Sequence, residues 1–151
     1  MRHGHKWGNK LRGCGFRLTI GREAIVDILS HTNSHMSAED IFFALHADSP
    51  NIGLTTVYRT LELLEKNGIV SKYEFGHGRA KFELTEAYGN KPHHHHLICR
   101  KCGTIIDYSD FMEDELAYLK KTEAGLGKKY KFTIHQHSIS FFGICEKCGA
   151  S

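Results

Sequence analysis

The sequence has no long apolar run: nothing in its 151 residues approaches the roughly 20 apolar residues that a membrane-spanning helix needs. We therefore expect no contact with a membrane. No apolar signal-peptide core precedes the chain either, so we expect the cytoplasm, where cysteines stay reduced. Acidic residues are absent from the first 22 positions, which carry only basic charges. Such a block suits a polyanion, although a merely solvated basic terminus explains the block alone equally well.

The rest of the composition is that of a folded chain. Hydrophobic residues make up 40% and charged residues 25%, so the chain can bury a core as one average domain or two small ones. No recognised catalytic motif is present, and we expect a protein that is not an enzyme.

Two Cys-x-x-Cys-Gly knuckles are the most informative motif. Cys99 and Cys102 form the first, and Cys145 and Cys148 form the second. Each pair can place two thiolates on one side of a tight turn, and the following glycine permits the left-handed backbone of such a turn. Four soft ligands complete a tetrahedral structural zinc site. Disulfides and a redox dithiol are alternatives, and spacing alone does not exclude a rubredoxin-like iron site. The fifth cysteine, Cys14, has no nearby partner.

The first 84 residues are predicted to form a winged helix, in which helices precede a two-stranded hairpin. Thr19 caps one helix, and residues 37–40 resemble a capping box that opens a second. A third helix runs from about Leu54 to Asn67 and stops at Gly68. The predicted strands are 69–75 and 79–84, joined by a turn at 76–78.

The second part of the chain is predicted to be a separate small unit. Residues 85–92 lose periodicity and are interpreted as a hinge. Beyond them we predict a strand at 105–108, a helix at about 111–122 and strand-like sequence over 130–144. At near sixty residues a hydrophobic core alone is marginal, so a zinc staple and dimerisation are the expected remedies.

The third helix has two faces, as a DNA-reading helix needs. Thr55 and Arg59 lie opposite its apolar stripe, with Thr56 and Tyr58 on the flanks. Polar residues in this position can enter the major groove, and Arg79 beside the hairpin turn can contact phosphate. An ordinary amphipathic surface helix is the simpler interpretation of the helix alone. The hairpin after it and the basic segment before it favour the DNA-binding one.

Four consecutive histidines, 93–96, stand before the first knuckle. In an extended segment His94 and His96 share one face, and His93 and His95 share the other, so one stretch can serve two metal sites. A single histidine is more often a surface or hydrogen-bonded residue, but this density has no packing explanation. Further nitrogen and oxygen donors are His35, Glu83 and Asp107 for one face, and His135, His137, Glu113, Asp114 and Glu115 for the other. Such donors suit iron(II), manganese(II) or zinc.

These residues match a known pattern, and over nearly its whole length the chain resembles the ferric uptake regulator family of bacterial metal-sensing repressors. The matching stretches are 17–19, 37–40, 56–61, 82–84, 93–103 and the final Cys145-x-x-Cys148. The resemblance implies an α+β protein with three parts. These are a winged-helix DNA-binding domain over 1–84, a hinge over 85–92, and an α/β dimerisation and metal-binding domain over 93–151.

The resemblance also implies ligand sets. It assigns structural zinc to Cys99, Cys102, Cys145 and Cys148. It assigns the regulatory metal to His35, Glu83, His94 and His96, with Asp107 as a further ligand. A third site, occupied in some members, falls on His93, His95, His137 and Asp114, with Glu113 or Glu115 as alternative acids. For DNA, it implies that Arg17 reaches toward the minor groove, while Tyr58 and Arg59 make recognition-helix contacts.

Two positions depart from the family pattern. Gly21 replaces a common proline, and His95 stands where iron-sensing members often have aspartate.

The expected function is an iron-responsive repressor that binds an A·T-rich inverted repeat as a homodimer, with a tetramer left open. The alternatives are zinc, manganese or peroxide sensing, or a different class: a metal-storage or delivery protein, or a metallohydrolase.

Overall fold

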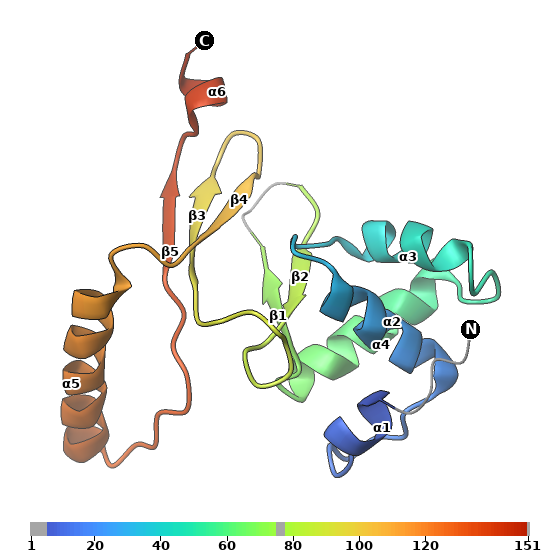
Figure 1. Cartoon of the computed structure of the whole chain (residues 1–151), viewed down its shortest axis with the longest axis horizontal. Helices are drawn as coiled ribbons and strands as arrows, with labels where there is room; N and C mark the ends of the chain where they lie inside the picture. Colours follow the sequence, from blue (N-terminus) through green and yellow to red (C-terminus); the bar gives the residue numbers. More distant parts are fainter. Residues whose placement is uncertain (1–5, 75–77, 151) are drawn as a thin grey trace. The chain divides into compact units, whose positions relative to one another are not determined.

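The computed structural model describes residues 6–74 and 78–150, which divide into two compact units (Figure 1). We call Met1–Pro92 the N-terminal unit and His93–Ser151 the C-terminal unit, and each is described by itself. The combination of helices and strands confirms the α+β class. Most of the turn predicted at 76–78 lies outside the described residues. Among the described helices, none is both long and apolar enough to cross a membrane.

The N-terminal unit consists of helices followed by an antiparallel hairpin, as predicted for a winged helix. Its elements are α1 (Lys6–Lys10), α2 (Ile20–His31), α3 (Ala38–His46), α4 (Leu54–Lys66), β1 (Val70–Tyr73) and β2 (Lys81–Leu84). Both predicted helix starts are confirmed, because the Thr19 side chain accepts from the backbone of Arg22 and Ser37 forms a full capping box with Asp40. Gly68 follows α4 with a φ of +67°, a left-handed conformation that glycine adopts without steric cost.

The core of this unit fixes the orientation of α4. Val57, Leu61 and Leu64 on this helix are fully buried, together with Ile25 of α2 and Ile41 of α3. Because these residues recur at helical spacing, the opposite face of α4 is left to solvent. Burial of the leucine stripe therefore presents the polar face that the sequence predicted for DNA.

The capping box of α3 should make the stability of this unit depend on pH. Hydrogen bonds from Ser37, with a smaller contribution from Lys81 at 3.2 Å, lower the pKa of Asp40 from 3.8 to about 2. A carboxyl pKa depressed by folding stabilises the protein above its unfolded value and loses that effect as pH falls from about 4 to about 2. We expect Asp40→Ala to cost about 1 kcal/mol at neutral pH, as other lost caps do.

The measurement is the urea midpoint followed by fluorescence of Trp7, which is the only tryptophan and is buried in this unit. Asp40→Asn keeps a side-chain oxygen but does not titrate, so its midpoint should not share the wild-type loss between pH 4 and pH 2. Identical pH profiles for the two proteins would contradict this account.

The C-terminal unit contains a three-stranded sheet and two helices. Its elements are β3 (His95–Cys99), β4 (Ile105–Tyr108), α5 (Met112–Tyr130), β5 (Ser140–Gly143) and α6 (Glu146–Gly149). The order is β4-β3-β5, with β3 antiparallel to β4 and parallel to β5. Strand β5 is thus an edge strand. The strand predicted at 105–108 is confirmed.

Two predictions for this unit were wrong in extent. The helix predicted to end near residue 122 continues to Tyr130, through Gly125 and Gly127. A side chain at Gly127 would place Cβ 2.9 Å from the carbonyl oxygen of Phe132, so this glycine serves the close turn that ends the helix. The strand predicted from 130 is confined to β5, because the ladder begins only where Ser140 meets His96.

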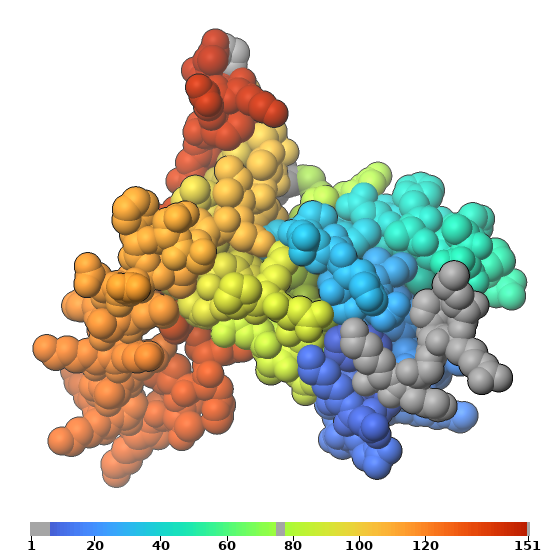
Figure 2. Space-filling view, viewed as in Figure 1, coloured from blue at the N-terminus to red at the C-terminus, as the bar shows by residue number. Residues whose placement is uncertain are grey.

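The second knuckle differs from the first in its backbone. Gly103 has a φ of +72°, as predicted, and its amide donates to the carbonyl of Cys99. Gly149 instead ends the short helix α6, where its amide donates to the carbonyl of Cys145 at 2.9 Å. A helical turn satisfies these backbone groups without a left-handed residue. Figure 2 shows the surface of α6 in red beside the gold surface of the β3–β4 region.

Candidate metal centres and DNA-facing surface

The four cysteines of the knuckles converge at one end of the C-terminal sheet. Their sulfur atoms all lie within 4.8 Å of one another. Cys99 ends β3, Cys102 lies in the following turn, Cys145 caps α6 and Cys148 lies within it. The sulfurs of Cys102 and Cys145 are 3.7 Å apart, whereas a disulfide needs about 2 Å. None of the four cysteines is in a disulfide, so the structure does not contain the alternative disulfides.

The electrostatics of this cluster favour a bound cation. The amide of Cys145 donates to the sulfur of Cys99 at 3.3 Å, and such hydrogen bonds lower the pKa of Cys99 to about 6. Hydrogen bonding with neighbouring thiols, Cys145 first, raises the pKa of Cys148 to about 12. Four thiolates this close repel one another unless a cation neutralises them. Four sulfur donors gathered this closely match the ligand set that zinc prefers in structural sites.

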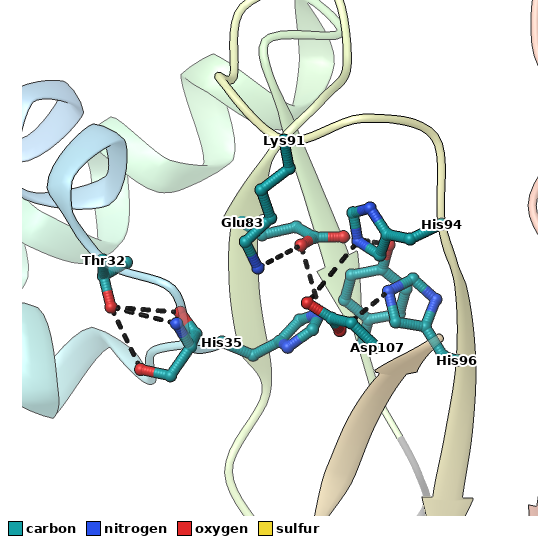
Figure 3. A network of polar contacts seen from close by, with 9 residues as sticks. Thr32, His35, Glu83, Lys91, His94, His96 and Asp107 are labelled. Atoms are coloured by element: carbon teal, nitrogen blue, oxygen red, sulfur yellow. Dashed lines mark hydrogen bonds and ion pairs between the residues drawn. The ribbon is translucent and has the colours of Figure 1, made fainter. Parts of the chain in front are cut away.

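Within the N-terminal unit, Glu83 is the centre of a buried polar cluster, shown in Figure 3. One carboxylate oxygen lies 3.2 Å from Nε2 of His35 and 3.7 Å from Nζ of Lys91. The other oxygen accepts a hydrogen bond of 2.8 Å from the hydroxyl of Tyr73. Backbone hydrogen bonds between Met36 and Phe82 tie the segment before α3 to β2 and so bring His35 to Glu83.

Within the C-terminal unit, Asp107 is held between two histidines (Figure 3). Its two oxygens lie 3.8 Å from Nε2 of His94 and 3.7 Å from Nε2 of His96. His96 and Asp107 are direct partners in the β3–β4 ladder, which accounts for their proximity. The structure therefore brings His94, His96 and Asp107 together, as expected from the shared face of the first two.

The other histidine face carries three converging imidazoles. Nε2 of His93 lies 3.0 Å from Nε2 of both His95 and His137, and the latter two are 3.5 Å apart. Carboxylates contact the opposite ring nitrogens: Glu115 lies 3.1 Å from Nδ1 of His95, and Glu123 lies 2.7 Å from Nδ1 of His137. A carboxylate on Nδ1 fixes the ring and leaves Nε2 to coordinate a metal. Burial lowers the pKa of His95, which favours the neutral form that binds metal.

The structure does not bring Asp114 into this group. Asp114 is exposed in the first turn of α5, while Glu115, one residue further, faces His95. His135 is also exposed and belongs to none of the groups of potential ligands that the described residues form. The acidic ligand of the third site stays a prediction.

Several residues around these clusters escaped the sequence reasoning. Tyr73 shares a strand face with Ser71, the cross-strand partner of Glu83, so the register of the predicted hairpin contained the signal. Glu123 lies beyond residue 122, where the helix was predicted to end, so the sequence did not place it on α5. No sequence motif predicts the contact of Lys91 with Glu83.

The residues proposed for DNA contact lie at the surface of the N-terminal unit. Thr55, Thr56, Tyr58 and Arg59 are exposed on α4, and Arg17 is exposed before α2. The carbonyl of Arg17 accepts a hydrogen bond of 2.6 Å from the guanidinium of Arg22. Arg79 is 64% exposed beside β2.

Known proteins with similar sequences indicate the family of this chain. The sequence model of the ferric uptake regulator family matches residues 13–142. A ferric uptake regulation protein of Bacillus subtilis is 39% identical over 140 residues, which cover 92% of this chain and 89% of that protein. A peroxide-responsive repressor of Staphylococcus epidermidis is 32% identical over 138 residues, covering 91% and 85%.

A solved structure of a ferric uptake regulator has the same fold. The ferric uptake regulator of Helicobacter pylori, described as having three functional metal binding sites, superposes with a TM-score of 0.69 at 26% identity. The match covers 97% of this chain and 91% of that one. The chain therefore belongs to the ferric uptake regulator family, whose members are metal-responsive transcriptional regulators.

Proposed function

We propose that this protein is an iron-responsive transcriptional repressor that binds an A·T-rich inverted repeat as a homodimer in the cytoplasm. One observation carries the proposal: a winged helix with an exposed polar recognition helix stands in the same chain as three clusters of metal-ligating side chains. The relatives named above support it. Storage, delivery and hydrolysis leave the winged helix without a role.

The structural site would hold zinc on the sulfurs of Cys99, Cys102, Cys145 and Cys148. A zinc ion there would neutralise the thiolates and cross-link the two knuckles. Cys99 and Cys102 anchor the β3–β4 turn, and Cys145 and Cys148 anchor α6 after the edge strand. These cysteines would thus hold the C-terminal sheet in register.

The regulatory site would be completed from both units. His35 and Glu83 would supply ligands from the winged helix, and His94, His96 and Asp107 would supply ligands from beyond residues 85–92. All of these ligands could coordinate one ion at the same time only in one arrangement of the two units. Binding of the ion would therefore favour that arrangement by linkage. Coupling of about 1–3 kcal/mol is typical of allosteric sites and corresponds to a 5- to 150-fold change in operator affinity.

The donor set favours iron over zinc. Three imidazoles with carboxylate oxygens suit iron(II) or manganese(II), and a dedicated zinc sensor would usually add a cysteine. Cys14 belongs to none of the groups of potential ligands among the described residues and lies 3.6 Å from the hydroxyl of Tyr88. Glu83 resembles the iron-sensing members more than the peroxide-sensing branch, in which the matching position is usually aspartate.

A second copy of the chain is the proposed partner of the C-terminal sheet. Leu97 pairs with Ile106 on one side and Phe141 on the other, so the three form one row on one face. Their side chains are 42–53% exposed and border an apolar concavity of about 250 Å³. Apolar rows and edge strands of this kind are usually covered by a partner. A tetramer remains a further proposal.

The test is anaerobic DNA binding, followed by fluorescence anisotropy at fixed salt with an operator selected from a randomised A·T-rich palindromic pool. We expect tight binding with iron(II), weaker binding in a mild chelator, and a bound stoichiometry of two chains per repeat. Binding with zinc alone would replace iron by zinc as the signal. Equal binding with every metal and with chelator would overturn the proposed switch.

A further inference from the structure

The first turn of α3 places acidic residues against the basic edge of the hairpin. Arg79 Nε lies 3.5 Å from a carboxylate oxygen of Glu39, and Lys81 Nζ lies 3.2 Å from Asp40. The same oxygen of Glu39 accepts a hydrogen bond of 2.9 Å from the hydroxyl of Tyr58 on α4. Glu39 therefore joins two residues that the sequence predicts to contact DNA, Tyr58 on the recognition helix and Arg79 on the wing.

The two acids differ in what they do for the fold. Asp40 is part of the capping box, because its carboxylate accepts from the amide of Ser37 at 2.8 Å. Glu39 is not part of that capping box, although its side chain also hydrogen-bonds with its own backbone and with Ser37. Its contacts with other elements are those with Tyr58 and Arg79. Asp40 therefore serves mainly the start of α3, whereas Glu39 also connects that start to Tyr58 on α4 and to Arg79 beside β2.

A carboxylate on a DNA-binding surface repels phosphate. Glu39 stays ionised here: although burial opposes ionisation, hydrogen bonds and the charge of Arg79 lower its pKa. The hydrogen bond to Glu39 raises the pKa of Tyr58, so its hydroxyl remains a donor. The Glu39 side chain is only 19% exposed, whereas Tyr58 is 40% exposed and the Arg79 side chain 64%. Glu39 thus stands behind two groups that face solvent.

We propose that Glu39 is a positioning residue that sets the DNA specificity of this protein, by orienting the Tyr58 ring on α4 and by neutralising Arg79 until a correctly placed phosphate replaces the carboxylate. The inference rests on the proposed function as a DNA-binding regulator. A fixed Tyr58 favours the base sequence that its ring fits. A neutralised Arg79 removes one attraction to DNA of any sequence, because phosphate contacts carry affinity without sequence information.

The experiment compares wild type with Glu39→Gln on two duplexes, the selected operator and a random sequence of equal length, with the metal that activates wild type. Glutamine retains an oxygen for the hydroxyl of Tyr58 but removes the charge that holds Arg79. We expect affinity for random DNA to rise and the operator-to-random ratio to fall roughly tenfold, with a random-DNA salt slope steeper by about one.

Two variants separate the roles of Glu39. Tyr58→Phe keeps the Glu39–Arg79 pair, so the ratio should fall through weaker operator binding while the random-DNA salt slope stays constant. Glu62→Gln is the matched control, because it removes the same charge from an exposed position of α4. It should change both affinities by similar factors. Trp7 fluorescence checks that each variant is folded.

The outcomes distinguish this inference from the proposed function. Wild type that shows no metal-dependent operator binding would overturn the proposed function and this inference together. Wild type that binds as proposed, with Glu39→Gln behaving like Glu62→Gln, would overturn the role of Glu39 alone. A reduced ratio in Glu39→Gln with an unchanged ratio in Glu62→Gln would support it.

Discussion

Replacing Cys99 by serine is expected to unfold the C-terminal unit while the N-terminal unit stays folded. Among the described residues of the C-terminal unit, the buried hydrophobic ones are Ile98, Cys99 and Met112. That core cannot offset the conformational entropy of about sixty residues. Structural zinc sites contribute about 10–16 kcal/mol of apparent binding free energy, which is available only to the folded ligand set. Loss of one thiolate should therefore cost more than this unit can lose.

The expected results are loss of bound zinc, loss of the α5 contribution to far-ultraviolet circular dichroism, and sedimentation of the folded remainder without a dimer. Trp7 fluorescence should keep its wild-type urea midpoint, because this residue lies in the core of the other unit. Cys14→Ser is the matched control, since it removes a thiol outside the cluster and should leave zinc content unchanged. A Cys99→Ser protein that retains a dimer and α5 would contradict the structural role of zinc.

Local sequence signals predicted the N-terminal unit well because each was complete within a few residues. The capping box needs only Ser37 and Asp40, and the end of α4 needs only Gly68. Binary patterning then placed Leu61 and Leu64 inside. These features depend on the conformational preferences of single residues and on helical periodicity, and both can be read from the sequence.

The errors in the C-terminal unit arise where distant contacts decide. Gly125 and Gly127 argue against a helix by propensity, yet α5 passes through both and ends where the carbonyl of Phe132 needs room. Which acid lies beside His95 also depends on a contact distant in the sequence, and the metal ligand of that site stays a prediction. Neighbouring residues of a helix point about 100° apart. Alignment with the family pattern therefore does not identify which of two adjacent acids faces a particular histidine ring.

Removing one regulatory ligand from either unit is expected to abolish metal-activated DNA binding to the same extent. Glu83→Gln removes a carboxylate from the N-terminal unit, and His96→Ala removes an imidazole from the C-terminal unit. If both bind one ion, each change alone should lose the 5- to 150-fold activation that coupling of about 1–3 kcal/mol provides. Metal-free binding should stay at the wild-type level, because neither residue lies on the exposed face of α4.

The double variant gives the sharper test, because residues that act through one shared ion are not additive. Glu83→Gln combined with His96→Ala should bind DNA no more weakly than either single variant, measured by anisotropy across an iron(II) titration. His135→Ala, an exposed histidine outside the clusters, should activate like wild type. Additive losses would mean that the two units bind separate ions, and the coupling of metal to DNA would then need a different structural route. Non-additive losses would identify the ion shared by both units as the link between iron and the recognition helix.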